Sequence, residues 1–312
     1  MNIAWLLEST GIAGATRVVL ALADAMVGRG HECSIVTTDA PLTWRRSSAD
    51  WIYLDNWKDF RAADHRFVIA TSPLTLEAAS RAGKRACYCF DGEIPDIDSP
   101  VLSPSQELLR RYPDRDITCI GAAVDDDVYR QNAPREHDPP RVLLAGPSHD
   151  ERRGVDDGYR AVAHARWFHQ QLSFVRVSPF VPSREEPLDA VQEFHVGLSA
   201  AEMTRLMHSC DVVLAPNHGD SFFSLVPMEA LAAGVPTVLT SIPTFLSFDS
   251  KQDYALFARD DDAVEFGERL IEMLEDEELR ERVRRRGREV AEQWRAKVVA
   301  DRLEQFLRAR TE

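Results

Sequence analysis

The stretch DVVLAPNHGDSFFSLVPMEALAAGVPTVLTS, residues 211–241, contains the order of elements that decides the fold. It begins with an apolar run typical of a buried strand and continues through a polar loop, residues 217–224. An apolar helix is predicted next, with Pro227 in its first turn and Gly234 at its end, and a second apolar strand closes the stretch. Strand, loop, helix and strand in this order form a βαβ unit, so we expect a parallel sheet.

The same alternation runs through the rest of the chain. In the first part, a strand, a glycine turn (residues 11–14), a helix and another strand follow one another; in the second, a helix is predicted over residues 155–170. Further strands are predicted at 3–7, 33–38, 51–54, 67–70, 86–90, 117–120, 141–146 and 172–177. The pattern therefore predicts an α/β protein with two Rossmann-like, doubly wound parallel-sheet domains.

The length of the chain supports two domains. At roughly 100–200 residues per domain, 312 residues are enough for two, and the polar, proline-bearing segment 130–140 is typical of a linker. We expect the first domain at residues 1–130 and the second at residues 131–294.

Composition restricts the class of partner and the compartment. With 51 acidic and 37 basic residues the net charge is −14, which argues against nucleic-acid binding through a general basic surface. Five cysteines, an odd number in a long chain, indicate buried free thiols in a reducing compartment. The start of the chain does not resemble a signal peptide, and no apolar run approaches about 20 residues, so a cytoplasmic location is expected.

The stretch 279–289, LRERVRRRGRE, is locally basic. Acidic neighbours at 275–278 favour a solvated helix face. Docking of this helix to anionic lipid head groups, a peripheral membrane contact, is the alternative.

Glu229 is the one carboxylate within the apolar part of the opening stretch. The amino end of a helix that follows a parallel strand attracts anions, so a phosphate could bind at loop 217–225. Glu229 could satisfy the helix dipole from the first turn, or it could accept hydrogen bonds from ligand hydroxyls such as those of a ribose. The pattern alone favours the first interpretation.

The order and content of these segments resemble the retaining glycosyltransferases of the GT-B fold, specifically family 4 (glycosyl transferases group 1). The run SFFSLVPMEALAAGVPTV matches the family's E-G-F-G-L-P loop, helix and following strand. Glu229 then falls on the family's second glutamate, which binds the donor ribose, and Ser221 on the first, which contacts the donor sugar; Asp220 lies beside it. The loop implies further donor contacts at Phe222, Phe223, Ser224 and Leu225.

A second matching segment is VLLAGPSHDERRGVDDGYRAV, residues 142–162. It resembles the family's strand, glycine (Gly146), variable loop and Lys-Gly pair, with Arg153 on the lysine. The resemblance implies that Arg153 holds the donor diphosphate and that Arg152 is a second candidate; a surface pair balanced by neighbouring acids is the alternative. Pro147 stands where the family often has another arginine.

Three further segments have counterparts in the family. Val196, Gly197 and Leu198 correspond to backbone beside the nucleotide base, and Gly14 to the glycine near the diphosphate or acceptor. Asp91 and Glu93 are the candidate acceptor contacts, with turn formation as the alternative role. The final segment, 295–312, is expected to pack back on the first domain, as it does in the family.

The implied function is metal-independent transfer of a sugar from a nucleoside-diphosphate sugar to an acceptor hydroxyl, in a cleft between the domains, with retention. Arg153, Ser221 and Glu229 are the expected catalytic residues, and no cofactor or metal is expected, so the Asp runs 125–127 and 260–262 are interpreted as loop acids. Because only one motif carboxylate remains, same-face transfer is favoured over double displacement. The acceptor class stays open, and glycoconjugate or polysaccharide biosynthesis is the expected setting.

Two alternatives remain. A GT-B sugar-nucleotide epimerase would need acid and histidine sets; His149, His195 and His218 exist, but no such set is legible. The other alternative is a protein that binds sugar nucleotides without catalysis. It would explain why Ser221 and Pro147 stand where the family usually has a glutamate and an arginine that contact the donor.

Overall fold

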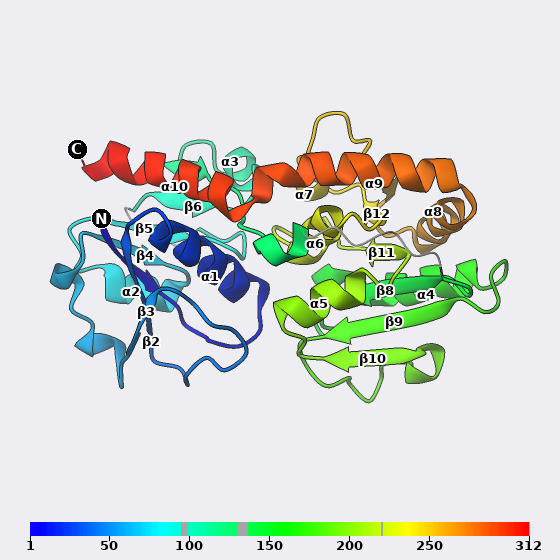
Figure 1. Cartoon of the computed structure of the whole chain (residues 1–312), viewed down its shortest axis with the longest axis horizontal. Coiled ribbons are helices and arrows are strands. Elements are labelled where there is room, and N and C mark those ends of the chain that lie inside the picture. Colours follow the sequence, from blue (N-terminus) through cyan, green and yellow to red (C-terminus); the bar gives the residue numbers. More distant parts are fainter. Residues whose placement is uncertain (95–98, 130–136, 220, 312) are drawn as a thin grey trace. The chain divides into compact units, whose positions relative to one another are not determined.

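Two parallel sheets organise the chain, one in each of two units (Figure 1). The computed structural model describes residues 1–94, 99–129, 137–219 and 221–311. The first unit contains Met1–Asp125 and Gln293–Glu312, and the second contains Asp126–Glu292. Two Rossmann-like domains in one chain are the architecture expected from the sequence.

The sheet of the first unit has the order β3-β2-β1-β4-β5-β6-β7, and all neighbouring strands are parallel. Its strands are β1 (Asn2–Leu6), β2 (Glu32–Thr37), β3 (Asp50–Tyr53), β4 (Phe67–Ala70), β5 (Arg85–Tyr88), β6 (Val101–Ser103) and β7 (Ile117–Cys119). Its helices are α1 (Gly14–Val27), α2 (Pro73–Ala79), α3 (Glu107–Arg111) and α10 (Ala296–Thr311), with short 3-10 turns η1 (Trp57–Asp59) and η2 (Ala62–Asp64). One core cluster lies between the strands and α2 and includes Leu6, Val36, Val68 and Leu76.

The final helix, α10, packs against α1 within the first unit (Figure 1). Arg29, just after α1, forms ion pairs with Asp301 at 2.8 Å and Glu304 at 3.1 Å. Arg302 donates a hydrogen bond to the carbonyl of Ile120. These contacts make the last residues of the chain part of the first unit.

The sheet of the second unit has the order β10-β9-β8-β11-β12-β13, again parallel throughout. Its strands are β8 (Arg141–Ala145), β9 (Ser173–Ser178), β10 (Glu193–Val196), β11 (Val212–Ala215), β12 (Thr237–Thr240) and β13 (Leu256–Ala258). Its helices are α4 (Val155–Ala165), α5 (Ala200–Met207), α6 (Leu225–Ala233), α7 (Pro243–Leu246), α8 (Ala263–Glu275) and α9 (Glu277–Ala291). Short 3-10 turns are η3 (Asp126–Tyr129), η4 (Glu151–Arg153) and η5 (Leu188–Ala190), and η6 (Glu292–Trp294) follows α9.

The helix expected over 155–170 is shorter than predicted, because α4 ends at Ala165. Arg166, the next residue, turns its guanidinium onto the carbonyls of Leu172 and Ala190. Trp167 and Phe168 are 82% and 64% exposed, so the chain after Ala165 has no apolar helix face that packs on the core. Ser199 and Glu202 form a capping box at the start of α5.

The five cysteines are free, and burial raises the pKa of every one: Cys33 to about 11, Cys87, Cys89 and Cys210 to about 12, and that of Cys119 also upward. Neutral, buried thiols are the state expected from the sequence. In the part of the chain that the structure describes, no helix is both long and apolar enough to cross a membrane.

Candidate functional site

The sheet of the second unit has a switch point between β8 and β11. From β8 the chain proceeds to β9 and β10 on one side, and it then returns to place β11 on the other side of β8. Ligands of open α/β sheets bind outside the carboxyl ends of the strands at such a point. The loops that follow these two strands, residues 146–154 and 216–224, therefore form the candidate site.

Two helices begin at these loops without a capping side chain. Gly154 is the N-cap of α4 and Ser224 the N-cap of α6, and neither helix has a side-chain hydrogen bond at its cap. The first N–H groups of a helix have no partner within the helix, and its dipole adds a partial positive charge at the same end. Both helix ends therefore suit an anionic group such as a diphosphate.

The two loops approach each other closely. Gly154 has a φ of +59°, and a Cβ atom built on it would lie 1.7 Å from the carbonyl oxygen of Pro216 at the end of β11. In addition, the N–H of His218 donates to the carbonyl of Arg152 at 3.0 Å. Only glycine has both the space and the backbone freedom that this approach requires at residue 154.

Arg153 connects the two loops through its side chain. Its Nη1 donates to the carbonyl oxygen of Phe223 at 2.9 Å, and its Nε donates to Asp150 at 3.2 Å. Gly146 leaves room for it, because a Cβ there would lie 3.3 Å from the Cβ of Arg153. Burial lowers the pKa of the Arg153 guanidinium and Asp150 raises it, with a net lowering, but an arginine stays charged in either case.

Arg152 is also paired with Asp150, at 2.8 Å, and its side chain is 46% exposed. The sequence left open whether Arg152 and Arg153 are paired with neighbouring acids. Both are paired with Asp150. The half-buried Arg153 is the one that also reaches the loop before α6.

The loop before α6 presents mostly buried side chains. Ser221, Phe222, Phe223, Ser224 and Leu225 are all less than 9% exposed. Ser221 Oγ accepts a hydrogen bond from Asn217 Nδ2 at 2.9 Å, and its carbonyl accepts one from Thr244 Oγ1 at 2.8 Å. Contact of this loop with a ligand would therefore fall mainly on its backbone. Asp220 lies outside the described residues.

Glu229 is buried in α6, with 1% of its surface exposed. It lies beyond the first turn, which contains no acidic residue, so the interpretation as a first-turn carboxylate on the helix dipole is wrong. Among the described residues, the other buried charged side chains are Arg176 and Glu186. A carboxylate kept at this depth in an apolar helix needs a polar partner in the folded protein.

His218, in the loop after β11, lies among three aspartates. Its Nδ1 is 2.9 Å from Asp260 and 3.2 Å from Asp261, and one atom each of Asp157, His218 and Asp261 lie within 4.8 Å of one another, close enough to hold a metal ion. Burial lowers the pKa of His218, but these carboxylates raise it more, so the net shift is upward. Asp262, the third residue of this acidic run, instead caps α8.

The remaining predicted residues lie near other strands or begin a helix. Val196 closes β10 and is 43% exposed, and Gly197 follows with a φ of +61°; Leu198 comes next in the chain. In the first unit, Gly14 begins α1. Asp91 and Glu93 follow β5 and are exposed; Asp91 accepts hydrogen bonds from the Cys89 thiol and the Glu93 N–H, so it also has the turn-forming role.

The arginines of the basic stretch lie on α9, and two of them are paired with acids. Arg284 contacts Glu281 at 2.7 Å, and Arg286 contacts Asp253 at 2.9 Å. Arg288 donates instead to the carbonyl of Ala233. These pairs favour the interpretation as a solvated helix face.

A buried ion pair beside the candidate site went unnoticed in the sequence. Arg176 on β9 and Glu186 are 0% and 1% exposed at their side chains and lie 2.8 Å apart. Glu186 also accepts hydrogen bonds from Tyr159 on α4 and from Ser148 in the loop after β8, both at 3.0 Å. The signal was an arginine inside the apolar strand 172–177.

The comparisons agree with this geometry. Residues 182–290, which include β11, the loop before α6 and Glu229, match the family model "Glycosyl transferases group 1". The matched residues make up about a third of the chain. The matched segment contains one of the two loops at the switch point, and the other, 146–154, precedes it in the same unit.

Relatives and solved structures extend the match. Over 97 residues the chain is 31% identical to a phosphatidyl-myo-inositol mannosyltransferase of Mycobacterium leprae, covering 31% of this chain and 26% of that protein. The chain thus spans about a quarter of that relative's length. The fold of the chain is similar to that of WaaG, a glycosyltransferase involved in lipopolysaccharide biosynthesis, with a TM-score of 0.70 and 13% identity over 98% of this chain and 99% of that one. It is also similar to that of Anabaena HepE in complex with UDP-glucose, with a TM-score of 0.79 and 13% identity over 98% of this chain and 99% of that one.

Proposed function

We propose that the chain is a glycosyltransferase that moves a sugar from a nucleoside-diphosphate sugar to an acceptor hydroxyl, with retention and without a metal ion. The observation that carries this proposal is the pairing of Arg153 with the uncapped amino end of α6 at the switch point between β8 and β11. The match to the glycosyl transferases group 1 family model and the mannosyltransferase relative support the same class of reaction.

In this proposal the donor diphosphate binds at the amino ends of α4 and α6. Arg153 has one guanidinium nitrogen, Nη2, that makes no hydrogen bond with the described residues, so a donor remains for a phosphate oxygen. Negative charge develops on the diphosphate as the sugar departs, and fixed N–H groups and a guanidinium stabilise that charge without reorganising. This arrangement supplies positive charge without a metal, which is why we propose metal independence.

Other residues have supporting roles. Glu229 accepts hydrogen bonds from the ribose, and the backbone at 196–198 lies along the base. Gly14 in the first unit permits close approach of the donor, and Asp91 and Glu93 contact the acceptor. A uridine nucleotide is the first donor to test, because HepE was solved with UDP-glucose.

We propose a same-face reaction. The bond between C1 and the leaving phosphate oxygen breaks, the bond between the acceptor oxygen and C1 forms on the same face, and the acceptor proton passes to the leaving phosphate. Ser221, a neutral residue where the family has a glutamate, offers no carboxylate for double displacement. The setting would be glycoconjugate biosynthesis in the cytoplasm.

One observation favours a second candidate, a protein that binds sugar nucleotides without transfer. Ser221 is buried, and its hydroxyl is already hydrogen-bonded to Asn217. It has no negative charge, unlike the family's glutamate, and its hydroxyl is not free to contact a sugar. Such a protein would use the same diphosphate site.

The test is to incubate the protein with UDP-glucose, UDP-N-acetylglucosamine and GDP-mannose, with and without mixed saccharide acceptors. Release of nucleoside diphosphate that depends on an acceptor, persists in EDTA and gives a product with the donor's anomeric configuration by NMR supports transfer with retention. Binding of a donor without release supports the second candidate. Activity that EDTA abolishes and Mn²⁺ restores would contradict metal independence and would direct attention to Asp157, His218 and Asp261.

A further inference from the structure

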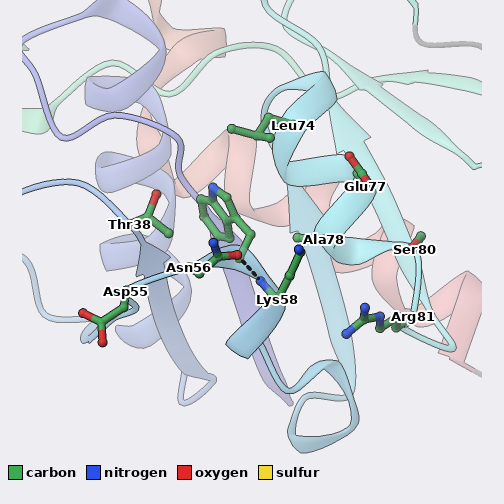
Figure 2. A pocket seen from close by; sticks show the side chains of 10 residues that line it. Thr38, Asp55, Asn56, Lys58, Leu74, Glu77, Ala78, Ser80 and Arg81 are labelled. Atoms are coloured by element: carbon green, nitrogen blue, oxygen red, sulfur yellow. Dashed lines mark hydrogen bonds between the residues drawn. The ribbon is translucent and has the colours of Figure 1, made fainter.

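A pocket in the first unit is lined by none of the candidate site residues described above. Its volume is about 370 Å³, and it lies between the ends of β2 and β3 on one side and α2 on the other. Figure 2 shows Thr38, Asp55 and Asn56 facing Leu74, Glu77 and Ala78 across it, with Lys58 between them. It therefore opens at the carboxyl ends of parallel strands, where α/β sheets bind small molecules.

The charges that line the pocket balance. Two acids, Asp55 and Glu77, face two bases, Lys58 and Arg81. Within the described ranges none of the four forms an ion pair, so all have hydrogen-bonding capacity to spare. A balanced lining gives no net attraction for a phosphate or for a cation. It favours a neutral ligand with many groups that both donate and accept hydrogen bonds.

The pocket also has an apolar wall. Trp57 and Leu74 line it, and the indole Nε1 of Trp57 is buried without a hydrogen-bond partner in the described part of the chain. A buried indole N–H normally has an acceptor, so an unpaired one beside a pocket indicates a ligand or water oxygen. An aromatic surface next to carboxylates and cations matches a sugar, which has an apolar C–H face and a rim of hydroxyls.

The size restricts the ligand further. Small-molecule pockets run from about 300 to 1,000 Å³, and this one is near the lower limit. A sugar ring fits that volume better than a whole sugar nucleotide. Asp91 and Glu93, the acceptor contacts suggested by the sequence, follow β5 and do not line this pocket.

We propose that this pocket binds one neutral sugar unit of the acceptor. The acceptor role rests on the proposed function, because only a transferase needs a site for an acceptor. The binding of a sugar can be measured without any donor. It predicts that Trp57 donates a hydrogen bond to a sugar oxygen, while Asp55 and Glu77 accept hydrogen bonds from sugar hydroxyls.

The indole N–H signals offer a direct measurement. The chain contains six tryptophans, so a ¹H–¹⁵N spectrum of the full chain should contain only six indole N–H signals. The signal that disappears in Trp57→Phe is the one from Trp57. Methyl glycosides of glucose, galactose, mannose and N-acetylglucosamine serve as probes. At least one should shift the Trp57 signal saturably, while the signal of Trp167, which is 82% exposed in the second unit, stays in place.

Matched variants test the chemistry of the pocket. Glu77→Gln and Asp55→Asn should each weaken that binding about tenfold, because a hydrogen bond to a charged group is lost. The control Asp114→Asn removes an exposed acid elsewhere in the first unit and should leave affinity unchanged. Octyl glycosides below their micelle concentration form a parallel arm: tighter binding than the methyl compounds would identify a lipid-linked sugar, and equal binding a free saccharide.

The outcomes separate the two proposals. If no glycoside shifts Trp57, or if the pocket variants bind as the wild type does, the pocket is not a sugar site, whatever the transfer assay shows. If a glycoside binds at Trp57 and no transfer is ever detected, the pocket proposal stands and the proposed function fails. Transfer that is unaffected in Trp57→Phe and Glu77→Gln would overturn the assignment of the pocket to the acceptor.

Discussion

Arg153 and Phe223 belong to different loops of the second unit, and the guanidinium of the first donates to the carbonyl oxygen of the second at 2.9 Å. One hydrogen bond thus fixes the side chain that we assign to the diphosphate relative to the loop that begins α6. Preorganised donors stabilise developing charge best, since they need no rearrangement during the reaction. The position of Arg153 is therefore as important as its charge.

Arg153→Ala should lower kcat/KM for the sugar nucleotide by about 10²–10³, the usual cost of removing one donor from a site of developing charge. Arg153→Lys should recover only part of this loss, because an ammonium group cannot donate to Phe223, Asp150 and a phosphate in the same planar geometry. Steady-state kinetics measure both. The control is Arg160→Ala, an arginine of α4 that is 72% exposed, whose activity should equal that of the wild type.

Gly154→Ala should strongly destabilise the second unit. The new Cβ would meet a backbone carbonyl at 1.7 Å and would force a non-glycine residue to a φ of +59°. The backbone conformation alone costs about 1–3 kcal/mol, and the overlap adds to it. Gly83→Ala is the matched control, since a Cβ there meets nothing within 4 Å. The measurement is unfolding in guanidinium chloride. Equal unfolding midpoints for the two variants would show that loops 146–154 and 216–224 are not packed as described.

Removing one partner of the Arg176–Glu186 pair should be costly, and removing both should be mild. Glu186→Ala leaves a guanidinium with 0% exposure uncompensated and should cost about 3–5 kcal/mol of unfolding free energy. The double variant Arg176→Met/Glu186→Leu should recover most of that loss, because apolar side chains then fill the site. Urea unfolding of the wild type and the two variants decides the matter; a double variant no more stable than Glu186→Ala would mean that the two charges are not coupled.

His218 should make stability depend on pH. Its pKa is raised above the unfolded value of 6.5, with burial opposed by Asp260, Asp261 and Asp157. A raised histidine pKa contributes stability that is fully present below pH 6.5 and is lost as the pH rises through the folded pKa. His218→Gln should therefore be less stable than the wild type at pH 6, by at most about 1 kcal/mol for a partly exposed group, and equal to it near pH 9. A stability difference that is constant from pH 6 to 9 would contradict the assignment.

The sequence predicts most strands that lie in a clear apolar run, even the three-residue β7, and misses three others. FVIA at 67–70 is β4 without a change of boundary, because its apolar residues and flanking polar ones leave no alternative. Strands β6 and β13 have three residues each, too few to show a period, and β10 is a half-buried edge strand with alternating polar residues; none of these was predicted.

Some features of the candidate site could likewise be predicted from the sequence, and others could not. The Gly154 turn and the α6 loop follow from local patterns and from the family resemblance, which identify single segments. Contacts between distant residues, such as Gly154 with Pro216 or His218 with Asp260, depend on which strands lie side by side. That order, β8 next to β11, follows from the packing of the whole sheet and cannot be read from any one stretch. The same holds for the pocket beside Trp57, where segments after three strands meet.

The central claim is that a nucleoside diphosphate binds across the loops that follow β8 and β11. Hydrogen–deuterium exchange with saturating UDP, GDP or ADP tests it most directly. We predict slower exchange in residues 146–155 and in the loop before α6 for the nucleotide that binds, with no such protection in Arg153→Ala at the same concentration. Binding of a nucleotide, seen by calorimetry, that leaves both loops unprotected or protects only other segments would contradict the account.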